Sequence, residues 1–186
     1  MTETRVAGGI HDTARVVLLN GPAGIGKTTV GRVLASLVPN GACIHGDCLK
    51  NFVVSRVGGT VLGGLGYING ATVAANFVDA GYDIVVFEYV FEHPAHVDRF
   101  LAAFPLPTPV HLFTLWAPLS LVVERERTRP DRERLGERVV ACYRAMEPHL
   151  GQLGHRVDNV DRSAQDVAVH IHGLCKEGRG GVSLPR

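Results

Sequence analysis

Residues 21–28 read GPAGIGKT, and this octapeptide limits the possible folds of the chain more than any other feature. It satisfies the pattern G-x-x-x-x-G-K-[ST] at every fixed position. Residues 15–20 (RVVLLN) precede it as a β-branched apolar run, and residues 27–38 follow with apolar side chains at helical spacing. A strand, a glycine-rich turn and a helix in this order form a loop whose backbone N–H groups surround a phosphate group. The sequence therefore predicts a nucleotide-binding site at this turn.

The loop pattern also predicts roles for its last two residues. Lys27 is expected to reach the β- and γ-phosphates of ATP or GTP, and Thr28 to bind Mg²⁺. The predicted nucleotide contacts are the loop and the residue after it: Gly21, Pro22, Ala23, Gly24, Ile25, Gly26, Lys27, Thr28 and Thr29.

Short apolar runs alternate with helical patterns through the rest of the chain. The expected strands are 42–45, 83–90, 110–116 and 155–160, and the expected helices are 69–80, 94–104, 119–128, 136–150 and 164–175. This alternation predicts a three-layer α/β fold with a five-stranded parallel sheet and helices on both faces. We expect one domain over residues 14–176, flanked by flexible tails at 1–13 and 177–186.

Composition narrows the range of partners and locations. The formal net charge is +1, so no bulk field attracts nucleic acid or an anionic membrane. No apolar run approaches the roughly 20 residues that a spanning helix needs. The four cysteines form no C-x-x-C pair and do not resemble a disulfide framework. These features favour a cytoplasmic protein with reduced thiols.

Asp47 follows the second expected strand, which we expect beside the first, and ligands of parallel sheets bind at such strand ends. A carboxylate there suits a general base that takes the proton of an acceptor hydroxyl. The alternatives are a carboxylate that holds a water on Mg²⁺ and an Asp that caps the following turn. His45, two residues earlier, is a candidate for the substrate site, although a histidine at a strand end is also often structural.

Glu88 lies within the apolar run 83–90, where burial of a carboxylate is costly unless it has a partner. An acid at the end of such a strand supports Mg²⁺ through water in many phosphate-loop proteins. We therefore predict a metal or substrate role for Glu88; the alternative is a buried pair with an arginine. Glu92, on the next loop, is a further candidate for substrate contact.

Six arginines lie between residues 124 and 138. Pro130 interrupts the helical pattern there, which favours a loop. We predict a lid at about 125–138 whose arginines close over the phosphates, with Arg129 and Arg132 as catalytic candidates. Interleaved acids leave a solvated charged helix as the alternative.

These stretches together resemble the chloramphenicol phosphotransferase-like kinases, with gluconate, shikimate and adenylate kinases as relatives. The resemblance extends from about Arg15 to Leu174. It rests on the run 18–21 leading into the phosphate loop, on Gly46-Asp47, on the run R-E-x-x-R-x-D-R at 125–132, and on Val157-Asp158-Asn159 followed by Ser163. It implies ATP-dependent phosphorylation of a hydroxyl with Asp47 as general base. It also implies that Arg125 contacts the adenine or the phosphates, and that Arg129 and Arg132 belong to the lid.

The same resemblance favours a hydroxyl-bearing antibiotic as the acceptor, phosphorylated in resistance or self-protection. Residues 58–70 hold six glycines and differ from the substrate segments of this family, so chloramphenicol itself is not implied. The apolar segment 52–68 is a candidate hydrophobic wall for a bulky acceptor, with Phe52 and Tyr67 as contacts. The alternative is that this segment only packs against the rest of the domain. It is also compatible with a homodimer. A sugar or nucleoside kinase, a nucleotide-hydrolysing switch and a sequestering protein remain alternatives.

Overall fold

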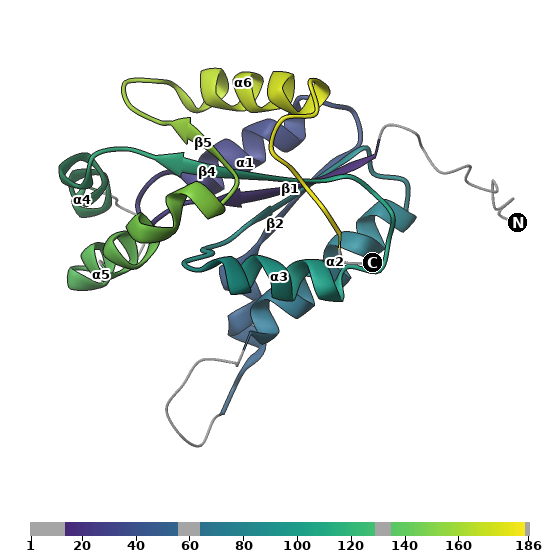
Figure 1. Ribbon diagram of the computed structural model, residues 1–186, viewed down its shortest axis with the longest axis horizontal. Coiled ribbons are helices and arrows are strands. Elements are labelled where there is room, and N and C mark those ends of the chain that lie inside the picture. Colours follow the sequence, from purple (N-terminus) through teal and green to yellow (C-terminus); the bar gives the residue numbers. More distant parts are fainter. Residues whose placement is uncertain (1–13, 56–63, 129–134, 185–186) are drawn as a thin grey trace, which may run out of the picture.

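The computed structural model describes residues 14–55, 64–128 and 135–184. Five parallel strands form the sheet, as predicted (Figure 1), but in their order, β2-β3-β1-β4-β5, the second strand does not lie beside the first as expected. They are β1 (Arg15–Asn20), β2 (Gly41–His45), β3 (Ile84–Glu88), β4 (Val110–Trp116) and β5 (His155–Asp158). Every residue of β3 and β4 is buried, which explains why these runs are almost wholly apolar rather than alternating.

Helices cover both faces of this sheet. α1 and α6 pack together on one face, and α2 and α3 pack together on the other (Figure 1). α4 and α5 lie beside each other beyond the carboxyl ends of the strands (Figure 1). The α-helices are α1 (Lys27–Ser36), α2 (Leu65–Asp79), α3 (Pro94–Ala103), α4 (Leu119–Arg127), α5 (Glu137–Met146) and α6 (Ala164–Lys176). Two 3₁₀ helices, η1 (Gly46–Phe52) and η2 (Glu147–Gln152), follow β2 and α5.

Helix α2 begins four residues before the predicted start at Asn69. Glycines disfavour helix by propensity, but Gly70 lies on the buried face of α2. A Cβ atom there would stand 2.3 Å from Cζ of Phe87 in β3. The glycine therefore allows a close approach of α2 to the sheet, and this packing outweighs the weak local preference.

The carboxyl-terminal segment differs from the flexible tail expected over residues 177–186. Residues Gly181–Val182 form β6, which pairs antiparallel with β4 and gives the sheet a sixth strand. The Leu112 N–H donates to the Gly180 carbonyl over 2.8 Å, and His111 Nδ1 lies 2.8 Å from the Arg179 carbonyl oxygen. The glycines that suggested disorder instead supply turn conformations before the strand, with φ of 72° at Gly178 and 70° at Gly180.

The hydrophobic core lies between the sheet and its two helix layers, and it includes Phe87, Phe91, Phe100 and Phe113. Among the described residues, no helix combines the length and the apolar character that a bilayer-spanning segment requires. Because the five strands are parallel, their carboxyl ends share one edge, and the predicted site residues follow those ends.

Candidate active site

The phosphate loop connects the end of β1 to the start of α1. Gly24 has a φ of 86°, and a Cβ atom there would lie 2.9 Å from both the Val122 carbonyl oxygen and Cβ of Glu126. The loop therefore passes directly against α4 at a position that only glycine fits. Helix α1 has Gly26 at its N-cap, which has no side-chain oxygen to accept the first N–H groups of the helix. These donors and the helix dipole form a cradle for a phosphate group.

Lys27 folds back over this loop. Its ammonium group donates to the carbonyl oxygens of Gly21, at 2.8 Å, and Pro22, at 3.0 Å. It thereby lies on the pocket side of the loop, where a nucleotide phosphate would compete for it. Thr28 lies in the first turn of α1 with its hydroxyl turned toward the end of β3, whereas Thr29 is exposed.

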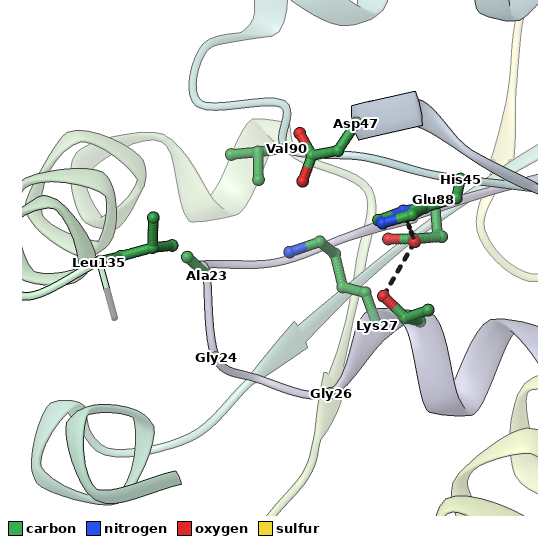
Figure 2. Close-up of a pocket in the computed structure, with 10 residues that line it drawn as sticks. Ala23, Gly24, Gly26, Lys27, His45, Asp47, Glu88, Val90 and Leu135 are labelled. Carbon is green, nitrogen blue, oxygen red and sulfur yellow. Dashed lines mark hydrogen bonds and ion pairs between the residues drawn. The ribbon is translucent and has the colours of Figure 1, made fainter. Parts of the chain in front are cut away.

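Glu88 is the last residue of β3, and its side chain is only 2% exposed. The Thr28 hydroxyl donates to Glu88 Oε1 over 2.9 Å. His45 lies opposite Glu88 in the β2–β3 register, and its Nδ1 contacts the same oxygen (Figure 2). Burial raises the pKa of Glu88, as does the nearby Asp47 carboxylate, while Lys27, His45 and Thr28 act in the opposite direction.

Asp47 lies in the first turn of η1, directly after β2, and is half-buried. Its carboxylate and the Lys27 ammonium group point into the same pocket (Figure 2). This pocket has an empty volume of about 370 Å³, counting its open mouth. Glu88 and His45 line its floor, and Val90 and Leu135 add apolar surface. Two acids, a lysine and a phosphate loop thus meet at one edge of the sheet.

Other predicted contacts lie around this pocket rather than in it. The Tyr67 hydroxyl donates to the Val90 carbonyl oxygen over 3.0 Å, and its ring stacks on His96 with centroids 4.8 Å apart. Burial raises the pKa of Tyr67, so its hydroxyl keeps its proton. Glu92 lies near the Cys142 thiol of α5. Phe52 is 77% exposed at the end of η1, away from the described lining of the pocket.

The arginine segment is described only in part. Arg125 donates to the Asn159 carbonyl oxygen over 2.8 Å, behind the phosphate loop. Arg127 pairs with Glu124 on the exposed face of α4. Arg129 and Arg132, the two predicted catalytic arginines, lie outside the described residues.

Two residues that support the loop were not among the predicted site residues. Asn159 is buried, and its side-chain amide donates to the Ile25 carbonyl oxygen over 2.7 Å. Cys142 in α5 lies near Ala23 of the loop, and burial raises the pKa of its thiol. Asn159 belongs to the run Val157-Asp158-Asn159, which carried part of the family resemblance. Nothing in the sequence distinguishes Cys142 from an ordinary core thiol.

Comparison with known proteins gives a likeness of fold. No protein-family model and no curated protein sequence matches the chain. Among solved structures, the chain is similar to the tunicamycin resistance protein of Deinococcus radiodurans, with a TM-score of 0.64, 19% identity, and 91% of this chain and 99% of that chain covered.

Two metabolic kinases show a similar match. A gluconokinase from Sinorhizobium meliloti gives a TM-score of 0.65 at 18% identity over 89% of this chain and 94% of that one. The shikimate kinase of Acinetobacter baumannii, solved with shikimate, gives 0.57 at 21% identity over 90% of this chain and 95% of that one. The chain therefore has the α/β fold of these phosphate-loop kinases.

Proposed function

We propose that this protein is a phosphotransferase that moves the γ-phosphoryl group of ATP or GTP to a hydroxyl group of a small molecule. One observation carries this proposal: Asp47, Glu88, Lys27 and the phosphate loop line a single pocket. The fold of small-molecule kinases supports it further. Asp47 supports it as well, because a carboxylate in this pocket suits a general base for an acceptor hydroxyl.

In the proposed reaction the phosphate loop and the first turn of α1 bind the nucleotide phosphates. Lys27 leaves the loop carbonyls and pairs with the transferred group, where it stabilises the charge of the transition state. Asp47 orients the acceptor hydroxyl and takes its proton. Arg125 contacts the nucleotide behind the loop, and Arg129 and Arg132 close over the phosphates from the proposed lid.

The residues present fit a magnesium ion. Mg²⁺ prefers hard oxygen ligands, usually one or two from the protein together with phosphate and water. The Thr28 hydroxyl and the Glu88 carboxylate, joined over 2.9 Å next to the loop, supply such oxygens. When bound, Mg²⁺ neutralises charge on the phosphoryl oxygens.

For the acceptor, we propose an antibiotic with a free hydroxyl group, phosphorylated in resistance or self-protection. The match to a protein that confers tunicamycin resistance supports this choice. The exposed apolar side chains Phe52, Val53, Val54, Leu65 and Ile68 would suit a bulky acceptor. A sugar or nucleoside metabolite is the second candidate, supported by the match to gluconokinase. His45 would contact either acceptor from within the pocket, and Tyr67 and Glu92 from beside it.

The test is a transfer assay with the purified protein, ATP or GTP, and Mg²⁺. The acceptor panel contains nucleoside antibiotics, chloramphenicol, aminocyclitols, gluconate and shikimate. Mass spectrometry then detects an acceptor that has gained one phosphoryl group, with Asp47→Asn as the inactive control.

A phosphorylated acceptor that only the wild type makes supports the proposal and identifies the substrate. Nucleotide hydrolysis at one rate with and without every acceptor, unchanged in Asp47→Asn, would contradict it and favour a hydrolysing switch. Tight binding of an acceptor without a phosphorylated product would instead favour sequestration.

A further inference from the structure

Asn20, the last residue of β1, has a fully buried side chain that makes three hydrogen bonds. Its Nδ2 donates to the Phe91 carbonyl oxygen and to Thr114 Oγ1, each over 3.1 Å. Its Oδ1 accepts the Phe91 N–H over 2.8 Å. Burial of an amide costs free energy unless its atoms are paired, and here both the oxygen and the nitrogen are paired.

Thr114 extends this connection. It lies opposite Asn20 in the β1–β4 register and is also buried. Its hydroxyl donates to the Leu153 carbonyl oxygen over 2.5 Å, just before β5. One chain of side-chain hydrogen bonds therefore joins the end of β1, the segment after β3, the middle of β4 and the approach to β5.

Both segments that Asn20 joins border the candidate site. Gly21, the first residue of the phosphate loop, follows Asn20 directly. Phe91 lies between Val90, which lines the pocket, and Glu92 in the segment 89–93, here called the acceptor loop. Asn20 holds both backbone polar groups of Phe91, so it fixes this loop at its centre. The buried Phe91 ring adds packing against Tyr67, with centroids 5.1 Å apart.

We propose that Asn20 is a positioning residue that couples the phosphate loop to the acceptor loop. Ordering of the phosphate loop by nucleotide is transmitted through Asn20 to the Phe91 backbone, so the donor phosphate and the acceptor groups keep a fixed separation. This inference rests on the proposed function for its role in phosphoryl transfer. Asn20 touches neither substrate and acts through the Phe91 backbone.

A polar side chain is needed at this position for a physical reason. An apolar residue of similar size would leave the Phe91 N–H and the Phe91 carbonyl oxygen without partners in a buried setting, and the Thr114 hydroxyl oxygen would lose its donor. Buried polar groups without partners destabilise the native conformation of this loop. They favour other conformations in which the same groups form hydrogen bonds with water. Misplacement by about 1 Å is enough to lower a transfer rate by about 10².

The test measures amide hydrogen exchange with Mg-ADP as the probe, which requires no acceptor. In the wild type, Mg-ADP should slow exchange of the Phe91 amide about tenfold, the range of ordinary coupling between sites. In Asn20→Asp this protection should disappear, while Mg-ADP still protects residues 21–28. Asp has the same shape as Asn but cannot donate to the Phe91 carbonyl or to Thr114.

A second pair of variants tests the same connection in case Asn20→Asp does not fold. Thr114→Val removes the hydroxyl and should reduce the protection of Phe91, whereas Thr114→Ser retains the hydroxyl and should restore it. Asn76→Asp, on the exposed face of α2, is the matched control and should behave as the wild type.

The transfer assay gives the functional readout. With the acceptor from the panel, Asn20→Asp and Thr114→Val should lower kcat with KM for ATP nearly unchanged, by about 10² for Asn20→Asp. Protection of Phe91 by Mg-ADP that persists in both variants, or that is absent in the wild type, would overturn the coupling. A wild type that phosphorylates no acceptor would overturn the proposed function instead, while the exchange experiment still decides the coupling.

Discussion

The phosphate-loop side of the pocket, the proposed nucleotide side, and the apolar segment at the end of η1, the proposed acceptor side, are built differently. On the nucleotide side, Gly21, Pro22 and Ile25 are buried, and Asn159 holds the Ile25 carbonyl from the far side of the loop. On the acceptor side, η1 ends in Phe52 and the segment continues with Val54, whose side chains are 77% and 97% exposed. The first side is fixed by hydrogen bonds to the backbone, and the second presents apolar side chains to solvent.

This difference predicts which side chains tolerate substitution and which do not. Side chains that hold the phosphate loop are shared with the core, so a change there alters folding and nucleotide binding together. Exposed side chains at the acceptor side contribute little to stability, so their replacement is tolerated and can alter substrate choice. Substitutions on the nucleotide side should therefore change the rate of phosphoryl transfer. Substitutions on the acceptor side should change which acceptor is used.

The largest effect is expected for Lys27→Ala. Removal of the ammonium group takes away the charge that the pocket offers to the transferred phosphoryl group, and phosphoryl transfer should fall by about 10³ or more. The measurement is the steady-state rate of phosphorylated product formation. Lys176→Ala, at the exposed end of α6, is the matched control and should retain the wild-type rate. Full activity in Lys27→Ala would show that the phosphate loop is not the donor site.

A smaller, more selective effect is expected for Asp47→Asn. The amide cannot take the acceptor proton, so kcat should fall by about 10². Nucleotide affinity, measured by calorimetry, should stay nearly unchanged because Asp47 belongs to η1 and not to the phosphate loop. Asp79→Asn, exposed at the end of α2, serves as control. Wild-type turnover in Asp47→Asn would remove Asp47 from the role of base.

The sequence specified the position of the glycine-rich loop more sharply than the contacts around it, for a physical reason. The loop needs fixed residue types at fixed spacing, because backbone N–H groups must surround a phosphate, and the pattern is therefore visible in residues 21–28. Strand alternation then placed Asp47 and Glu88 at one sheet edge. The contact of Glu88 with both His45 and Thr28 depends on strand order, which local patterns do not specify.

Tertiary packing accounts for the parts that local patterns did not predict. The early start of α2 reflects the close approach of Gly70 to Phe87, and β6 forms because β4 offers an edge to residues Gly181–Val182. Cys142 reaches Ala23 only because α5 folds back over the loop. Each contact joins residues far apart in the sequence, where local propensity carries no information.

A several-fold effect is expected for Phe52→Ala, which tests the acceptor side. The KM of an apolar acceptor should rise by about 3–10-fold, since loss of contact with one exposed ring removes roughly 1 kcal/mol of binding. KM for ATP and the melting temperature should not change, because the side chain is exposed. Val169→Ala, also exposed but on α6, is the matched control. An unchanged acceptor KM in Phe52→Ala would exclude this ring from the acceptor site and leave the pocket itself as the determinant.

The smallest effect is expected for Ser163→Ala, which tests the scaffold of the nucleotide side without entering the pocket. Ser163 caps α6, and its hydroxyl accepts the Asp166 N–H over 3.1 Å in a capping box. Loss of this cap should lower the melting temperature by about 2–4 °C near neutral pH and leave transfer unchanged. Hydrogen bonds from Ser163 lower the pKa of Asp166. The stability from this pair is therefore present above the unfolded pKa of the carboxyl group and is lost as the pH falls through its lower folded value. The difference between Ser163→Ala and the wild type should accordingly shrink in acid, and a difference that grew on acidification would contradict the capping box as its source.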